Sequence, residues 1–199
     1  VSPKHAKVMG STLCLFNPLV IKITMEGGKS MDYRIEERGY QRCIAIVRAF
    51  SNEIINDEEN QEIPDFWGEC NEKNLVEPLL NLRPVGKKDL YGLCSPAKEE
   101  SKTFNYGIGI IVDQDTEIKD EKALYEAGYE TWEMDSCTYA VFKCIGNDGD
   151  CIGSTWSRFY KEFLPQTGYE STDATDYELY FEKGEPGLFC ELWIPIKKK

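Results

Sequence analysis

Histidine is almost absent from this 199-residue sequence, in which His5 is the single copy. No Cys-x-x-Cys pair occurs, and His5 lies in a polar N-terminal stretch far from any group of cysteines. Zinc sites need closely spaced cysteine, histidine or carboxylate ligands, so this spacing argues against a metal site. Nucleophilic catalysis that pairs a serine or cysteine with a histidine is disfavoured for the same reason. We therefore predict neither a metal nor another cofactor.

Basic residues and long apolar runs are also scarce. The chain has 23 Lys and Arg against 35 Asp and Glu, a net charge of −12. Proteins bind nucleic acid largely by neutralising phosphates with Lys and Arg, so direct contact with DNA is not expected from this segment. No apolar run approaches the roughly 18 residues of a membrane helix, so the chain is not expected to span a membrane. The acidic field suits a cationic ligand, although the same balance also serves solubility.

The eight cysteines do not indicate a disulfide scaffold. Reduced cysteines behave as small hydrophobic residues. Six of them lie within apolar or alternating runs: Cys43, Cys70, Cys94, Cys137, Cys144 and Cys190. We expect mainly free thiols and a reducing, cytoplasmic location. The sequence starts at Val1 without a signal-peptide pattern, which we interpret as a fragment of a longer intracellular chain.

The first part of the chain predicts a linker followed by one β-α-β-β unit. Residues 1–30 end in MEGGKS, a Gly/Ser break that we take as a linker boundary. The aromatic and β-branched segment 33–50 indicates one or two strands. Apolar residues at three- and four-residue steps predict a helix over 63–82, which Pro78 should kink or divide. Segments 89–96 and 104–113 then predict a hairpin.

The second part repeats this order. Segment 129–146 has strand character, 151–168 predicts a helix that Pro165 and Gly168 end, and 176–184 with 188–196 predict a closing hairpin. Both helices open with Ile-x-x-x-Trp, which ends at Trp67 in one and at Trp156 in the other. The sequence therefore predicts an α+β fold of duplicated β-α-β-β units, about 31–113 and 125–199. Each unit should have an antiparallel sheet and one main helix, with a ligand cleft at the pseudo-twofold axis.

A carboxylate interrupts the last predicted strand, GLFCELWIPIK, at Glu191. An unpaired ionised carboxylate costs several kcal/mol when it leaves water, so Glu191 should reach solvent, become protonated or meet a cation. Trp193, two residues on, should share its face of the strand, although Pro195 could introduce a bulge there.

Several motifs together resemble the GyrI-like small-molecule-binding domain, the effector-binding domain of many bacterial AraC-type transcription regulators. They are EIPDFWGEC, YGIGIIVD, SCTYAVFKC, RFYKEFLPQTGYE and CELWIPIKKK, within residues 31–199. The resemblance implies a central pocket for a cationic or amphipathic molecule, as in multidrug recognition, and an acidic residue on the last strand that faces this pocket. Glu191 occupies that position. Distant relatives with this fold bind haem, which the lack of a pocket histidine disfavours here.

The N-terminal residues are similar to the junction between an AraC-type DNA-binding domain and its effector domain. The stretch SPKHAKVMG contains a Ser-Pro turn of the kind that ends such DNA-binding domains. This resemblance implies that residues 1–30 are a linker and the tail of a preceding domain, and that any DNA contact belongs to a helix-turn-helix outside this segment.

The predicted ligand-binding residues are a carboxylate and five aromatic side chains: Glu191, Trp67, Tyr106, Tyr139, Trp156 and Trp193. Each has an alternative role, Glu191 as a solvent-facing residue and the aromatic residues as ordinary core or half-buried strand residues. The tryptophans could attract a cation through their ring faces, and the tyrosines could donate a phenol hydrogen bond.

Three functions remain open from the sequence. The first is a ligand-sensing domain of a transcription regulator. The second, implied by the resemblance, is a GyrI-like hydrolase of reactive ring-containing electrophiles that uses the pocket glutamate as a general base. The third is a dimerisation module, and a homodimer is compatible with each of them.

Overall fold

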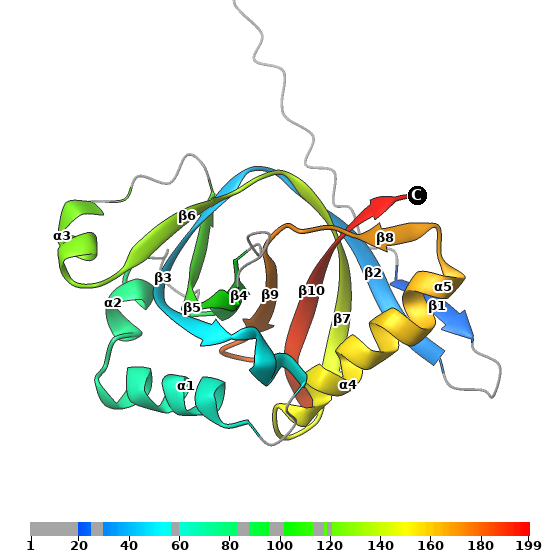
Figure 1. The fold of residues 1–199 in the computed structure, drawn as a ribbon, viewed down its shortest axis with the longest axis horizontal. Coiled ribbons are helices and arrows are strands. Elements are labelled where there is room, and N and C mark those ends of the chain that lie inside the picture. The colour runs from blue at the N-terminus through cyan, green and yellow to red at the C-terminus, as the bar shows by residue number, and fades with distance from the viewer. Residues whose placement is uncertain are drawn as a thin grey trace, which may run out of the picture.

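A computed structural model describes residues 20–24, 30–56, 60–82, 88–95, 102–113, 118 and 121–199. Over these residues the chain forms a ten-stranded antiparallel sheet with helices packed against it, which confirms the predicted α+β class (Figure 1). The strands are β1 Val20–Thr24, β2 Ser30–Arg38, β3 Gln41–Ser51, β4 Leu90–Cys94, β5 Thr103–Asp113, β6 Glu130–Met134, β7 Cys137–Ile145, β8 Tyr169–Ser171, β9 Asp176–Tyr180 and β10 Leu188–Lys198.

Two helical segments follow the predicted positions. The first half contributes the 3₁₀ turn η1 Asn52–Asn56, α1 Glu62–Glu72 and α2 Glu77–Leu80. The second half contributes α3 Glu121–Glu126, α4 Asp150–Arg158, the π-helical turn η2 Phe159–Phe163 and α5 Leu164–Gln166.

The predicted helix over 63–82 is divided, as Pro78 suggested. α1 ends at Glu72, and Asn74 in the turn that follows has a φ of 53°, a left-handed conformation that asparagine tolerates. Pro78 lies in the first turn of α2, where its missing N–H costs no hydrogen bond. The sequence did not predict β1, β8 or α3, which are short or lack clear periodicity.

The strand order reveals the duplication. Along the sheet it runs β1-β2-β7-β10-β9-β4-β5-β3-β6, and β8 pairs with the end of β10. One repeat, β3-α1-β4-β5, meets the other, β7-α4-β9-β10, where β4 pairs with β9. Each repeat also receives an edge strand from the other half, because β2 pairs with β7 and β6 pairs with β3. The pseudo-twofold axis therefore passes between β4 and β9.

The segment 20–24, within the predicted linker, belongs to this sheet as β1 and pairs with β2. Ser30, the last residue of that linker, begins β2, whereas residues 1–19, with the Ser-Pro turn, and 25–29 lie outside the described residues.

The repeats depend on glycine where strands approach closely. A side chain at Gly109 of β5 would collide with the backbone carbonyl of Ile44 in β3. The Gly-x-Gly sequence in YGIGIIVD therefore permits the long β3–β5 pairing.

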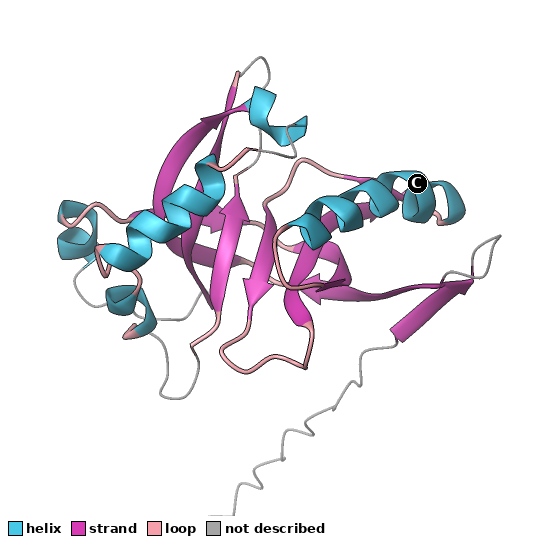
Figure 2. Cartoon of the chain, turned by 90° about the horizontal axis from the view of Figure 1, so that it is seen from below, coloured by secondary structure: helices cyan, strands magenta, loops and turns pink. Residues whose placement is uncertain are grey.

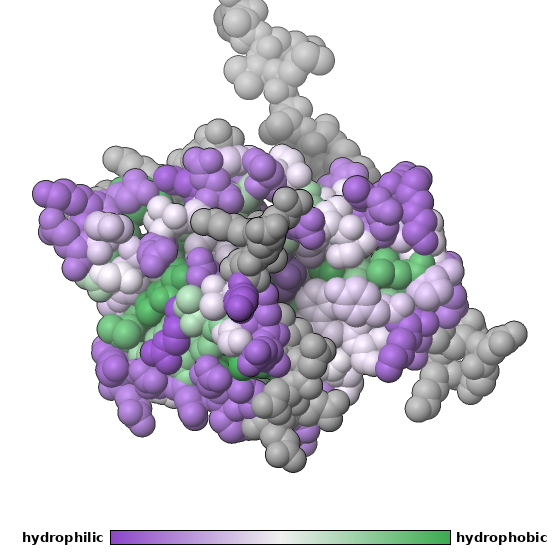
Figure 3. All heavy atoms as spheres, viewed as in Figure 1, coloured by the Kyte–Doolittle hydropathy of each residue, from purple (hydrophilic) through white to green (hydrophobic). Residues whose placement is uncertain are grey.

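The sheet has two different faces. On one face α1 packs against Phe50, Tyr106 and Ile108, and α4 packs against Cys144 and its neighbours on β7 and β10. Figure 2 shows both long helices on this side, with central strands running between them. The opposite face buries a cluster from both repeats to which no helix of the described segments contributes: Cys43, Ala45, Leu93, Ile111, Met134, Tyr139, Val141, Tyr177, Leu179 and Trp193. Figure 3 shows hydrophilic residues around the rim of the molecule and hydrophobic residues gathered in patches at its left and right.

β10 supplies residues to both faces by simple alternation. Cys190, Leu192 and Ile194 face the helices, whereas Glu191 and Trp193 face the other way. The predicted shared face of Glu191 and Trp193 is confirmed by a 3.3 Å hydrogen bond from the Trp193 indole N–H to Glu191 Oε2. The irregularity in the pairing lies between Leu188 and Cys190 and not at Pro195, where a bulge had been considered.

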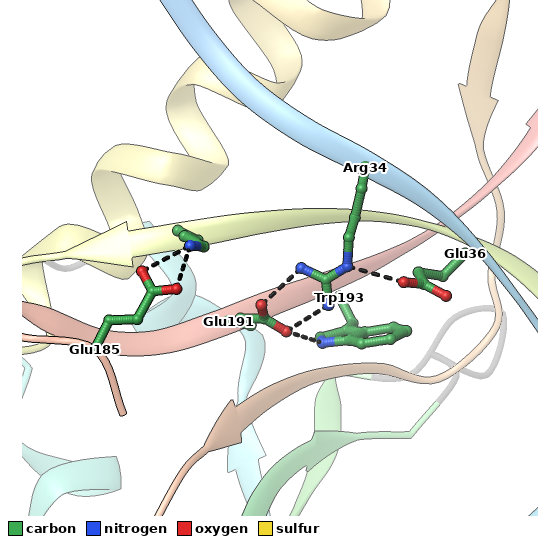
Figure 4. A network of polar contacts seen from close by, with 6 residues as sticks. Arg34, Glu36, Glu185, Glu191 and Trp193 are labelled. Carbon is green, nitrogen blue, oxygen red and sulfur yellow. Dashed lines mark hydrogen bonds and ion pairs between the residues drawn. The ribbon is translucent and has the colours of Figure 1, made fainter. Parts of the chain in front are cut away.

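Arg34 on β2 neutralises Glu191 in a bidentate ion pair. Its two terminal nitrogens donate to the two carboxylate oxygens at 2.6 and 2.7 Å, and its Nε donates to Glu36 at 2.9 Å (Figure 4). Burial acts to lower the pKa of Arg34, but the hydrogen bond and charge of Glu191 outweigh it and raise the pKa. Since β2 belongs to the first half and β10 to the second, this pair ties the halves together.

Replacing Arg34 by Met should destabilise the fold strongly, because Glu191 would remain buried without its cation. The expected loss is about 3 to 5 kcal/mol in the free energy of unfolding, measured by urea denaturation. The matched control is Lys143→Met, because Lys143 forms a nearby but more exposed ion pair with Glu185 at 2.7 Å. The side chains of Lys143 and Glu185 are 44% and 64% exposed, whereas those of Arg34 and Glu191 are 17% and 7% exposed. The loss in the free energy of unfolding caused by Lys143→Met should stay below about 1 kcal/mol. Equal losses in the two variants would contradict the structural role of the buried pair.

Candidate functional site

The structure separates the six predicted ligand-binding residues into two groups on opposite faces of the sheet. Trp67, Tyr106 and Trp156 pack on the helix-covered face. Glu191, Tyr139 and Trp193 lie on the face without helices. A single small molecule cannot contact both groups while the sheet lies between them.

The group around Glu191 is closed by contacts within the chain. Glu191 already has a cation in Arg34, and a second guanidinium, that of Arg38, lies 4.6 Å from the ring centroid of Trp193. Trp193 is 2% exposed, and the Tyr139 phenol donates to the carbonyl of Thr175 at 3.2 Å. The cation that the sequence analysis sought for Glu191 is thus supplied by β2.

A different carboxylate, Glu178 of β9, is the centre of the group on the helix-covered face. The Tyr106 phenol donates to Glu178 Oε2 at 2.7 Å, and the Tyr180 phenol donates to the same oxygen at 3.1 Å. The Trp67 indole N–H donates in turn to the Tyr106 oxygen at 3.0 Å. We call these four residues the Glu178 cluster. In the described part of the chain, no basic side chain pairs with Glu178, and Oε1 accepts no hydrogen bond.

The strand pairing at the pseudo-twofold axis creates this cluster. Glu178 lies directly opposite Gly92 of β4, and a side chain at Gly92 would collide with both the Tyr106 phenol and the Glu178 carboxylate. Tyr106 comes from β5, the neighbour of β4, so its ring crosses above Gly92 to reach Glu178. Glycine at this position therefore provides the space that the phenol–carboxylate contact needs.

Aromatic rings lie on the helix-covered face next to α1 and next to α4. Trp67 of α1 meets Tyr180 edge to face at 5.1 Å between centroids, and Tyr180 meets Phe189 at 5.8 Å. On the side of α4, Trp156 stacks on Tyr160 at 5.9 Å, and Tyr160 is 57% exposed. Unlike Tyr106, the rings of Trp67, Tyr180 and Trp156 remain partly exposed. They offer faces and edges that a ligand can contact.

Two acidic groups in this region have shifted pKa values. Burial raises the pKa of Glu178, against the opposing effect of the hydrogen bonds from Tyr106 and Tyr180. Burial, and then the charge of Glu178, raise the pKa of Asp176 to about 7, although a hydrogen bond with the Cys94 thiol acts in the other direction. Half-buried carboxylates whose pKa is raised by desolvation, without a compensating cation, are often found at functional sites.

The sequence analysis missed Glu178 and Tyr180. In this segment Tyr177, Leu179 and Phe181 alternate with Glu178, Tyr180 and Glu182, a pattern that predicted a strand of the closing hairpin and pointed to no ligand contact. In the structure both faces of β9 pack against protein, because β9 lies at the centre of the sheet. The available signal was the Tyr-Glu-Leu-Tyr sequence, in which a glutamate lies between aromatic residues on a strand next to the axis.

The described residues contain no group of three or more metal-binding side chains arranged to hold an ion. The seven cysteines among them, all but Cys14, are free, as expected. None of the helices found in the described segments has the length and apolar character needed to cross a membrane.

Comparison with known proteins identifies the fold. The family model described as integron-associated effector binding protein matches residues 34–196. A structure of SAV2435 bound to tetraphenylphosphonium aligns with a TM-score of 0.65 and 20% identity over 84% of this chain and 94% of that chain. An integron cassette protein from the mobile metagenome of Vibrio cholerae aligns with a TM-score of 0.55 and 16% identity over 83% and 95%.

The C-terminal domain of EcmrR aligns with a TM-score of 0.51 and 10% identity over 85% of this chain and 99% of that chain. No curated protein sequence matches. At these identities the solved structures establish the fold, whereas the family model covers most of the chain. The duplicated sheet, the paired helices and this match together show that the chain belongs to the integron-associated effector binding protein family and is a GyrI-like effector-binding domain.

Proposed function

We propose that this domain is the ligand-sensing part of an AraC-type transcription regulator and binds a small cationic, amphipathic molecule beside Glu178, between α1 and α4. The DNA-binding function would reside in a helix-turn-helix outside this segment, in a cytoplasmic regulator. This proposal moves the ligand carboxylate from Glu191, as predicted from the sequence, to Glu178.

The observation that supports the proposal is that the negative charges of the two carboxylates, Glu191 and Glu178, are compensated differently. Glu191 has an ion pair with Arg34 at 2.6 Å. Glu178 has two phenol donors on one oxygen and no basic partner among the described residues. A cation at Glu178 would supply the missing charge, and the rings of Trp67 and Tyr180 would add contact area and cation–π attraction of about 0.5 to 2 kcal/mol each.

The ligand class is also supported by the fold relatives. SAV2435, which shares this fold, has been solved with tetraphenylphosphonium, a lipophilic aromatic cation. The net charge of −12 on the present chain would favour the approach of a cation. For signalling, such a ligand must bind one state of the whole regulator more tightly than the other, because equal affinities shift no population.

Hydrolysis of a reactive ring-containing electrophile is the second candidate. Its support is the raised pKa of Glu178 next to two phenols, since a carboxylate with a raised pKa suits general-base activation of water. The test is formation of the diol from styrene oxide by the wild-type protein. Turnover that disappears in Glu178→Gln would favour the enzyme over the sensor.

Glu178→Gln should weaken the binding of tetraphenylphosphonium. The amide keeps an oxygen for the two phenols but removes the charge, and a Coulomb interaction over about 6 to 8 Å at an effective dielectric constant near 20 is about 2 kcal/mol. We therefore expect a loss of about 30-fold in affinity, measured by calorimetry. The affinity for neutral triphenylphosphine oxide should fall much less in Glu178→Gln.

Glu191→Gln is the matched control, because it tests the carboxylate that the sequence analysis selected. Glu191→Gln should change the affinity for tetraphenylphosphonium only slightly. Urea denaturation measures the fraction of folded protein, so that a loss of folded protein is not counted as a loss of affinity. The opposite pattern, with Glu191→Gln losing affinity and Glu178→Gln retaining it, would return the ligand site to the face without helices.

Asp176→Asn should stabilise the free protein at alkaline pH. Because the pKa of Asp176 is about 7 in the folded state and about 3.9 in an unfolded chain, the folded state holds the extra proton between these values. The contribution of this proton to the free energy of unfolding is therefore fully present below about pH 4 and is lost as the pH rises to about 7.

Asparagine resembles the protonated form at every pH, so the variant should gain on the order of 4 kcal/mol over wild type at pH 8 and about 2 kcal/mol at pH 5.5. Urea denaturation at the two pH values measures the difference. Asp173→Asn, at an exposed position, serves as the control. A gain that does not change with pH would contradict the assigned titration.

A further inference from the structure

Two cysteines face each other across the strands β7 and β10. Cys144 and Cys190 are directly opposite in the antiparallel register, and both have 0% of their surface exposed. The β-carbons at such positions are about 4.5 to 5.5 Å apart, close to the roughly 3.5 to 4.5 Å of a disulfide. The two thiols are in hydrogen-bond contact, and both are free. The function proposed above uses neither of them.

The strand pairing is irregular beside these two cysteines. The pairing that precedes Cys190 joins Leu188 to Ile145, so Phe189 is an extra residue in β10. Such a β-bulge redirects side chains, and bulges are frequent next to reactive sites. Cys144 is also the penultimate residue of β7, and Ile145 after it is 61% exposed. Because the ends of strands open more readily than their centres, a small reagent can reach the pair.

Helix α4 covers the pair through a chain of hydrogen bonds. The Cys144 thiol donates to Thr155 Oγ1 at 3.4 Å, and the Thr155 hydroxyl donates to the carbonyl of Cys151 at 2.8 Å. The hydrogen bond from Cys190 lowers the pKa of Cys144, although burial acts in the other direction. The same hydrogen bond raises the pKa of Cys190. Cys144 is therefore the thiol that loses its proton first and acts as the nucleophile.

We propose that Cys144 and Cys190 are a site of reversible oxidation, at which hydrogen peroxide forms a disulfide between β7 and β10. The Cys144 thiolate attacks one peroxide oxygen, the O–O bond breaks, and hydroxide leaves with the proton that Cys144 had lost, as water. Cys144 is now a sulfenic acid. The Cys190 sulfur attacks the Cys144 sulfur, the S–O bond breaks, and the hydroxyl leaves as water with the Cys190 proton. The two sulfurs together lose two electrons, which reduce the peroxide.

The complete burial of the pair determines the class of oxidant. Hydrogen peroxide is little larger than water and needs only a local opening at the end of β7. Glutathione disulfide would have to place its own sulfur against Cys144, which α4 and the rest of the core cover. The disulfide also removes the proton that Cys144 donates to Thr155, so oxidation costs one hydrogen bond between α4 and the sheet.

The test treats the reduced full chain with hydrogen peroxide under native conditions and then counts thiols in denaturant. The count should fall by two from the eight of the sequence, and dithiothreitol should restore it. Trypsin should release residues 144–158 linked to residues 184–197, and fragment spectra should assign the bond to Cys144 and Cys190, not to Cys151. Glutathione disulfide at the same concentration should leave all eight thiols free.

Cys190→Ala should prevent the linkage and leave Cys144 as a sulfenic acid, which dimedone traps as an adduct. The matched control is Cys43→Ala, because Cys43 is equally buried but opposes Ile111 and Trp132. This variant should form the disulfide as the wild-type protein does. Retention of all eight thiols in the peroxide-treated wild-type protein, or a bond from Cys144 to another cysteine, would overturn the proposal. These two readouts need no variant, so they decide the outcome even if Cys190→Ala does not fold.

Discussion

The hydrogen-bonded pairing of β4 with β9 is the constraint on which the rest of this structure depends. It joins the two repeats into one sheet and places Gly92 directly opposite Glu178. Because glycine has no side chain, the Tyr106 phenol from the next strand can cross it and reach the carboxylate. A shift of one residue in this register would turn Glu178 to the other face and remove the cluster.

The buried Glu191 and the half-buried Glu178 illustrate two ways in which a fold can treat a carboxylate that is partly removed from water. Glu191 receives both terminal nitrogens of Arg34 and an indole N–H, so its charge is satisfied by the chain itself. Glu178 receives only neutral phenol donors, and its pKa rises because burial is not offset by a cation. The first arrangement contributes to the structure. The second leaves a carboxylate without a cation, which a cationic ligand can supply, and the uncompensated carboxylate lowers the stability of the free protein.

The duplication explains why the proposed site lies at the boundary between the two repeats. Each repeat packs its own helix against its own half of the sheet, so the two hydrophobic cores remain separate on that face. The strands between them contain the polar residues Asp176 and Glu178, and the partly exposed rings of Trp67 and Trp156 come from the equivalent Ile-x-x-x-Trp segments of α1 and α4. A ligand bound there would contact both repeats, and its binding energy would depend on their relative positions.

The sequence by itself determined the local elements and their repetition. Alternating and three-to-four-residue patterns predicted the two main helices, the strand order β-α-β-β and the division at Pro78, because these depend on side-chain periodicity and on proline geometry. It also placed Glu191 and Trp193 on one face, since strand residues two apart point the same way.

Only the tertiary structure decided which carboxylate lacks a cation. Arg34 and Glu191 are far apart in the sequence, and their contact exists because β2 crosses to the second repeat and pairs with β7 beside β10. Likewise, both faces of β9, which carries Glu178, pack against protein because β9 meets β4 at the centre of the sheet. Strand pairing between distant segments leaves no periodic signal in one sequence, so charge compensation across strands was not predictable from it.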